Sequence, residues 1–318
     1  MLLSIINKPP ELHIPDGFLN TTVAVVSWII TIIFLAVAVK KSKEELNERQ
    51  VPLMGIMAAF IFAAQMINFP VAGGTSGHFL GGALAAIVLG PWAGMLVMAS
   101  VVGVQALLFQ DGGLLVMGAN ILNMGILTTL IGYGLYRAVS GKDKLVRYGV
   151  VVLAAWLAVM AGALATSAQL WMSGTSPAQF VFPAMIYVHA LVGIGEALIT
   201  VGALAFIERV RPEIVSEKKV TERGGKTWII VGVVISLLVV LISPFASGNP
   251  DGLERVAEDL NFLSVGLDAP YEILPDYTIP ILGDSGISTI TAGVVGVLCV
   301  IAIVFITMRL VRNIKLGE

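Results

Sequence analysis

The chain has 318 residues, of which 57% are hydrophobic and 13% charged, and its mean hydropathy is +0.92. Soluble domains carry about 25% charged residues, so this composition excludes an ordinary soluble protein. The single cysteine, Cys299, lies in an apolar run, which excludes a disulfide framework and a thiolate cluster for a soft metal. Membrane lipid is the expected surrounding, and no nucleic-acid partner is expected.

Eight long apolar runs almost lack charged residues, and the short segments between them hold nearly all the charges. This pattern is typical of a polytopic helical bundle in a membrane, so the predicted fold class is all-α. The runs occupy residues 18–39, 51–69, 79–109, 114–136, 148–171, 180–207, 228–246 and 287–308.

The basic residues predict the topology. Four segments, 40–49, 137–147, 209–226 and 309–315, hold 17 of the 19 lysines and arginines, and the positive-inside rule places all four on the cytoplasmic side. Since segments 40–49 and 137–147 lie on the same side, the chain must cross the membrane an even number of times between them. Three apolar runs lie there. One run must form two segments.

The run at 79–109 is the candidate for this division. It would be about 46 Å long as one straight helix, and Gly90-Pro91 interrupts it near the middle. The two halves would be short, so one of them is expected to be tilted or partly irregular where protein covers it. We therefore predict nine membrane segments, seven in residues 18–207 and two after residue 226.

The charged segment 209–226 contains Pro212 and Gly224-Gly225, and we interpret it as a cytoplasmic linker between two modules. The expected organisation is a metal-binding membrane module at 12–208, the linker at 209–226 and a two-span module at 227–318. Residues 1–11 are expected to be a non-cleaved leader or to precede the true start of translation. The second module contains a loop with eight acidic residues and one basic residue, Arg255, and this loop is expected to be extracytoplasmic. The acids are Asp251, Glu254, Glu258, Asp259, Asp268, Glu272, Asp276 and Asp284.

Three histidines occur in the chain, and the predicted topology places them on or near the outer face. His13 precedes the first run, and His78 follows a glycine-rich outer segment, so the two could converge on a transition metal. His189 lies within the run at 180–207 and is more readily explained as a hydrogen-bonded helix residue. From spacing alone, the pair predicts a metal or proton site.

Other motifs limit the alternatives. A zinc-protease HExxH motif and a phosphate-binding GxxxxGK[ST] loop are both missing from the sequence, so ATP hydrolysis is expected on other subunits and no catalytic residue is predicted. Glu196 is the one acid well inside a run. It could couple transport to protons or sodium in a stand-alone secondary carrier, or it could pair within the bundle.

The sequence resembles the CbiM/NikM family, the cobalt and nickel substrate-binding components of energy-coupling factor transporters. The resembling segments are HIPDGFL at 13–19, PLMGIMAAFIFAAQMINFPVAGGTSGHFLGGALAAIVLGPWAG at 52–94 and VHALVGIGEALIT at 188–200. In addition, NPDGLERVAEDL at 249–260 resembles the PDGLE domain, a small two-span component found beside or fused to nickel-type members.

This resemblance implies a seven-helix bundle followed by two more spans, in the cell membrane of a prokaryote, with the metal site facing outside. It implies Ni²⁺ or Co²⁺ as the transported substrate, with no organic cofactor. It also implies a transmembrane coupling subunit and two ATPase subunits or domains as partners. The PDGLE segment favours nickel over cobalt.

The resemblance also implies a ligand set. In the family, a terminal amine, the amide nitrogen and imidazole of the next histidine, and a loop histidine bind the metal; the histidines correspond to His13 and His78. Four nitrogen donors suit Ni²⁺. Here Leu12 occupies the position of the amine, so the amine is available only if the mature chain begins there. Otherwise the site is altered.

Three groups of weaker candidates remain. Asn68, Thr75 and Ser76 lie near His78 and are candidates for orienting it, although ordinary loop capping would also explain them. Gly55, Ala59 and Ala63 form a small-residue stripe for packing, either against the coupling subunit or within the bundle. The polar residues inside apolar runs are expected to hydrogen-bond with one another; they are Gln105, Asn120 and Asn123.

Overall fold

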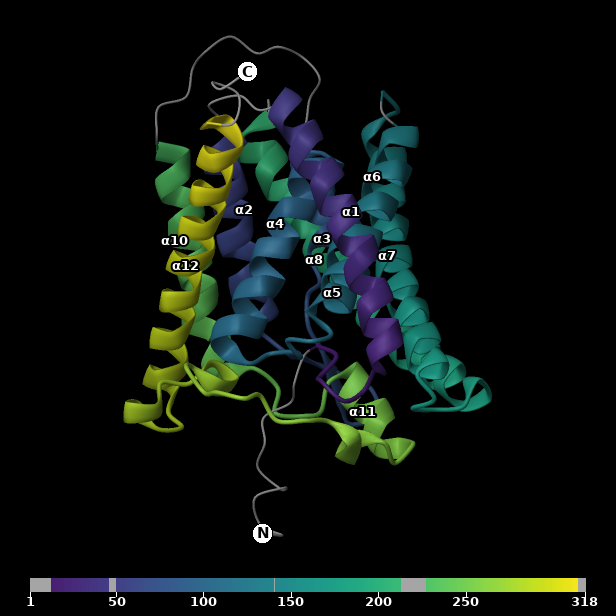
Figure 1. Ribbon diagram of the computed structural model, residues 1–318. Helices are drawn as coiled ribbons and strands as arrows, with labels where there is room; N and C mark the ends of the chain where they lie inside the picture. The colour runs from purple at the N-terminus through teal and green to yellow at the C-terminus, as the bar shows by residue number, and fades with distance from the viewer. Residues whose placement is uncertain (1–12, 46–49, 140, 213–226, 314–318) are drawn as a thin grey trace.

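The computed structural model describes residues 13–45, 50–139, 141–212 and 227–313, which form a bundle of long helices (Figure 1). The all-α prediction is confirmed, since the sheet in these ranges is a single two-stranded hairpin. The leader at 1–11, Leu12 and most of the linker at 209–226 lie outside the described residues.

Residues 13–212 contain seven helical segments at the predicted apolar runs. They are α1 (Thr21–Glu45), α2 (Gln50–Gln65), α3 (Gly82–Leu89), α4 (Pro91–Val104) continued by the π-helical η1 (Gln105–Phe109), α5 (Met117–Asn120) continued by the π-helical η2 (Ile121–Leu127) and α6 (Thr128–Ala138), α7 (Lys144–Met172) and α8 (Ala178–Val210). Exposed apolar side chains on α1, such as Ile29, Ile32 and Ile33, suit contact with lipid. Six helices among the described residues are long and apolar enough to cross a membrane, and α2 is a shorter apolar helix.

The run at 79–109 is divided as predicted. α3 ends at Leu89, and Pro91 is the first residue of α4. α3 has eight residues, all buried, and is about 12 Å long, too short to cross a membrane. Residues 79–81, which precede it, are irregular and buried within the protein. Residues 79–81 and α3 together form the short, partly irregular piece that was predicted for one half of this run.

Glu196 of α8 supports that irregular backbone. Its carboxylate accepts hydrogen bonds from the backbone N–H groups of Leu80 at 2.6 Å and Gly81 at 3.0 Å. Non-helical backbone at membrane depth needs such partners, because hydrocarbon supplies none. Of the two roles considered for Glu196, the structure therefore shows pairing within the bundle.

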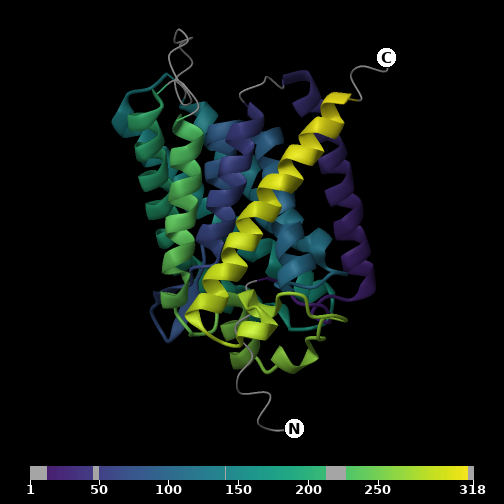
Figure 2. The same cartoon turned by 90° about the vertical axis from the view of Figure 1, so that its left-hand side faces the viewer.

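The second module packs against the first. It consists of α10 (Thr227–Ile242), the turn η3 (Ser243–Phe245), a long loop and α12 (Gly286–Asn313), and the loop contains α11 (Gly252–Asp259), η4 (Leu263–Val265), η5 (Pro275–Tyr277) and η6 (Pro280–Leu282). α12 runs diagonally across the bundle (Figure 2) and packs on α2 and α4. A Cβ atom at Gly55 of α2 would lie 3.5 Å from the Phe305 ring of α12. The small-residue stripe thus faces an internal contact at this point.

The loops gather at one end of the bundle, which we call the loop end (Figure 1). It carries residues 13–20, the turn between α7 and α8, the loop at 246–285 and the hairpin of β1 (Phe69–Val71) and β2 (Thr75–Gly77). The two strands are antiparallel, and Pro70 pairs with Ser76. The helix ends that adjoin the four basic segments lie at the opposite end, as the charge pattern predicts.

Candidate metal centre

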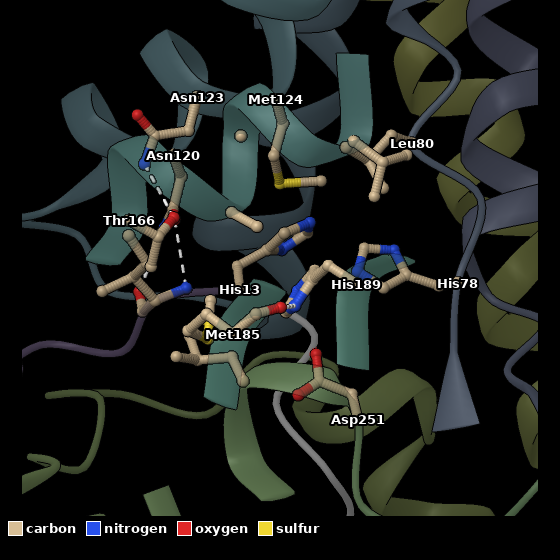
Figure 3. Close-up of a pocket in the computed structure, with 15 residues that line it drawn as sticks. His13, His78, Leu80, Asn120, Asn123, Met124, Thr166, Met185, His189 and Asp251 are labelled. Atoms are coloured by element: carbon tan, nitrogen blue, oxygen red, sulfur yellow. Dashed lines mark hydrogen bonds between the residues drawn. The ribbon is translucent and has the colours of Figure 1, made fainter. Parts of the chain in front are cut away.

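His13 and His78 meet at the loop end of the bundle. Their ring centroids are 5.6 Å apart with the ring planes perpendicular, and the residues are 2% and 7% exposed. Both line a cavity of about 60 Å³, together with His189 of α8 and Asp251 of the second module (Figure 3). A cavity of this size accommodates an ion with bound water. The pair predicted from the sequence is therefore brought together.

The segment around His13 is fixed by its backbone. The Asn120 side chain donates to the carbonyl oxygen of Ile14 and accepts from its N–H, both at 3.0 Å. Asp16 accepts hydrogen bonds from the backbone N–H groups of Leu114, Leu115 and Val116, which lie just before α5. Gly112 has a φ of +90°, and a Cβ atom there would lie 2.7 Å from the His13 Cβ. Only glycine fits beside His13 at this turn.

A carboxylate orients the His13 ring. Nδ1 lies 3.0 Å from Oδ1 of Asp111 and 3.1 Å from its carbonyl oxygen. Burial lowers the pKa of His13, but the Asp111 carboxylate more than offsets this and leaves the pKa raised above 6.5. In the neutral imidazole, donation from Nδ1–H to Asp111 leaves a lone pair on Nε2, which is buried without a hydrogen-bond partner. Metal-binding histidines commonly have this carboxylate partner.

Asp111 is in turn held by the second module. Tyr277 in η5 donates its hydroxyl to Oδ2 of Asp111 at 2.5 Å, and Gln105 donates to the same hydroxyl oxygen at 3.0 Å. Burial favours the neutral acid, yet His13 and Tyr277 together leave the pKa of Asp111 lowered. A continuous set of contacts therefore runs from the second module to His13.

His78 directly follows β2, and its Nδ1 is buried without a hydrogen-bond partner. Burial, aided by the neighbouring His13, lowers the pKa of His78 to about 3. The imidazole is consequently neutral at physiological pH, the form that binds metals. His13 Nε2 and His78 Nδ1 are two buried nitrogens that lack a partner, as expected at a site that receives a cation.

His189 also lines the cavity. Its Nδ1 lies 2.9 Å from the carbonyl oxygen of Met185, one helical turn earlier in α8, so it is a hydrogen-bonded helix residue whose Nε2 keeps a lone pair. Asp251 is 3% exposed and caps α11 by accepting from the N–H of Glu254 at 2.7 Å. Among the described residues, no three histidine, cysteine or acidic side chains already stand together at metal-ligand spacing.

The residues considered for orienting His78 contact the second module. Ser76 donates its hydroxyl to the carbonyl oxygen of Asn249 at 2.8 Å, and Thr75 donates to that of Pro250 at 3.2 Å. The carbonyl oxygen of Asn68 accepts from the N–H of Ser247 at 2.8 Å. These hydrogen bonds hold the hairpin and the loop together.

The expectation that Gln105, Asn120 and Asn123 hydrogen-bond with one another is wrong. Asn123 pairs with Thr166 and Gln169 of α7, at 3.1 and 2.7 Å, and the other two have the partners given above. Their partners come from segments distant in sequence, where position within an apolar run gives no guidance. Two further pairings were likewise not predicted: Asp111 with His13, and Tyr277 with Asp111. The sequence signal for Asp111 is weak: an acid followed by two glycines after an apolar run.

Comparison with known proteins agrees with this architecture. Residues 13–214 match the CbiM family, described as "Cobalt uptake substrate-specific transmembrane region", and residues 226–313 match the PDGLE domain. The chain belongs to the CbiM/NikM family. The predicted combination of a CbiM/NikM-type region with a PDGLE domain is thereby confirmed.

Individual members of the family are named as nickel transport proteins. The "Putative fused nickel transport protein NikMN" of Archaeoglobus fulgidus is 36% identical over 95% of this chain and 100% of its own length. The "Fused nickel transport protein NikMN" of Rhodobacter capsulatus is 29% identical over 71% of each chain. A crystal structure of a truncated transition metal transporter is 34% identical, with a TM-score of 0.57 over 62% of this chain and 99% of that one. This CbiM/NikM member is therefore a multi-pass nickel or cobalt transport component.

Proposed function

We propose that this protein is the substrate-binding component of an ATP-driven importer of the energy-coupling factor type, and that it takes up Ni²⁺ at the extracytoplasmic face. The observation that carries the proposal is the buried pair of imidazoles of His13 and His78, with unpartnered nitrogens facing one cavity. Placing the basic end of the bundle in the cytoplasm puts this cavity outside. The expected partners are a transmembrane coupling subunit and two ATPase subunits or domains.

Nickel is favoured over cobalt for this chain. Nitrogen donors bind both ions, so the ligands alone do not select between them. The relatives from A. fulgidus and R. capsulatus, which match this chain over most of its length, are named as fused nickel transport proteins. A cobalt importer component remains the alternative.

A stand-alone secondary carrier is less well supported. Such a carrier needs an ionisable group that is free to exchange a proton or sodium ion near the membrane centre. Glu196, the acid deepest in a helix, accepts two backbone hydrogen bonds that support the start of α3. Its carboxylate is therefore committed to the fold.

The ligand set has two forms, which depend on residues outside those described. If the mature chain begins at Leu12, its amine can join His13 and His78. If the amide nitrogen of His13 binds the metal, the imidazole of the same residue can bind that ion only through Nδ1, because Nε2 points away from the backbone. Since Nδ1 contacts Asp111 here, the ring would have to turn. If residues 1–11 are retained, His13 binds through Nε2.

The test is nickel binding to the purified full-length protein by calorimetry. His78→Ala should weaken binding by roughly 100-fold or more, about 2.7 kcal/mol, because it removes one metal ligand. Mg²⁺ should not bind either protein, since it prefers oxygen ligands. An unchanged melting temperature without metal would confirm that the variant folds. Near-normal nickel affinity in folded His78→Ala would refute the site.

A further inference from the structure

The second module places an acidic side chain inside the histidine cavity. Asp251 belongs to the segment Asn249-Pro250-Asp251-Gly252-Leu253-Glu254, yet it lines the same cavity as His13, His78 and His189 (Figure 3). The sequence suggested an acidic loop, but it did not distinguish Asp251 from the seven other acids. Of these eight, only Asp251 lines this cavity.

The position of Asp251 is set by hydrogen bonds to β2, the strand that ends just before His78. The carbonyl oxygen of Pro250 accepts from the N–H of Ser76 at 2.8 Å, and the Ser76 hydroxyl donates to Asn249 at 2.8 Å. His78 is two residues beyond Ser76. These two hydrogen bonds therefore fix the position of the Asp251 segment relative to His78.

The next residue, Gly252, brings the segment close to the third histidine. A Cβ atom at Gly252 would lie 2.9 Å from Cε1 of His189 and 3.2 Å from its Nε2. A larger residue at this position would push α11 away from α8. The absence of a side chain at Gly252 thus lets the segment that carries Asp251 lie against His189.

A buried carboxylate requires a cation or several hydrogen-bond donors. The carboxylate of Asp251 accepts the capping hydrogen bond of α11 from the N–H of Glu254 and a further backbone hydrogen bond from Leu253. Arg255, the one basic residue of the acidic loop, pairs with Asp259 at 3.2 Å. Burial raises the pKa of Asp251 to about 7, in agreement with incomplete compensation of its charge. A divalent cation between the carboxylate and the imidazoles would supply the missing charge.

We propose that Asp251 is a direct oxygen contact of the divalent cation in this cavity, so that the second module completes the metal site that the first module begins. The inference rests on the proposed function of the His13 and His78 pair. Because the described side chains are not yet at metal-ligand spacing, the carboxylate and the imidazoles close on the ion when it binds. Imidazole and carboxylate ligands together are compatible with Ni²⁺ and Co²⁺.

The first test compares single variants of the full-length protein for Ni²⁺ affinity by calorimetry. Asp251→Asn and Asp251→Ser remove the charge but keep a side-chain oxygen that can cap α11. Both should weaken Ni²⁺ binding by about tenfold or more. Asp284→Asn is the matched control, because it removes an exposed acid of the same loop. Its affinity should stay within about twofold of the unmodified protein.

The second test asks whether the contact is direct. The visible absorption bands of bound Co²⁺ depend on its ligands, so they should shift in Asp251→Asn and stay unchanged in Asp284→Asn. Either an affinity within about twofold of the unmodified protein for both Asp251 variants or an unchanged Co²⁺ spectrum would overturn the inference.

The variant His78→Ala separates this inference from the proposed function. If His78→Ala loses nickel binding while the Asp251 variants keep it, the histidine site stands and the inference fails. If folded His78→Ala binds normally, the proposed function itself fails. Melting temperatures measured without metal identify any variant whose fold is damaged, and Asp251→Ser then provides a second measurement beside Asp251→Asn.

Discussion

Replacing Tyr277 by phenylalanine should weaken metal binding, although Tyr277 does not line the cavity that His13 and His78 share. Its hydroxyl donates to Asp111 at 2.5 Å, and Asp111 holds Nδ1 of His13 at 3.0 Å. The variant keeps the aromatic ring, which stacks on Phe109 with centroids 4.8 Å apart. Packing is thus retained, and the change is confined to one hydroxyl group.

The magnitude follows from the contacts that are lost. Without the hydroxyl, the carboxylate of Asp111 loses one donor and the buried Gln105 amide loses its acceptor. Removing one partner from a buried polar group costs about 1–3 kcal/mol. Changing the group that orients a metal-binding histidine typically costs about 10–100-fold in affinity. We expect nickel affinity to fall within that range, equivalent to about 1.4–2.7 kcal/mol.

The assay is calorimetric titration of Ni²⁺ into full-length Tyr277→Phe beside Tyr271→Phe. Tyr271 is a matched control, because it lies in the same loop and donates its hydroxyl to the carbonyl oxygen of Leu107 at 3.0 Å instead of to Asp111. Tyr271→Phe should bind nickel almost as well as the unmodified protein. Equal affinities for the two variants would refute the view that the second module orients His13 through Asp111.

Two further predictions concern the start of the chain and the carboxylate in α8. If a terminal amine is a ligand, a chain that begins with methionine in place of Leu12 should bind nickel far more tightly than one retaining residues 1–11; equal affinities, with both masses confirmed, would exclude the amine. Glu196→Gln should lower the melting temperature, since a single amide oxygen replaces the two carboxylate oxygens that accept from the N–H groups of Leu80 and Gly81. The loss of one acceptor should lower the free energy of unfolding by about 1–3 kcal/mol. An unchanged melting temperature would contradict this structural role.

The helices were predictable because a membrane limits the choices of the chain. Backbone groups in hydrocarbon must be paired, so long apolar runs become helices. The charge distribution adds a parity condition, which required one run to be divided. Gly90-Pro91 identified the position of the division, and the structure has α3 end and α4 begin there.

The partners within the site were harder to predict. His13 and Asp111 are 98 positions apart, and Asp111 and Tyr277 are 166 positions apart. Hydrophobic periodicity shows which segments are helical, but it does not show which loop ends meet once the helices pack. His13 and His78 could be paired because they are rare and flank outer segments. Asp251 is one of eight acids in its loop, so only its burial distinguishes it.

The loop of the second module contacts both histidine-bearing segments. On one side Tyr277 holds Asp111 beside His13, and on the other Pro250 accepts from Ser76 beside His78. Each hydrogen bond contributes only about 1 kcal/mol net, so a separate small protein would occupy this position weakly through these contacts alone. Joining the modules in one chain makes the contact intramolecular and raises the effective concentration of the loop at the site. Fusion therefore keeps the loop of the second module at these contacts beside His13 and His78 more firmly than separate chains would.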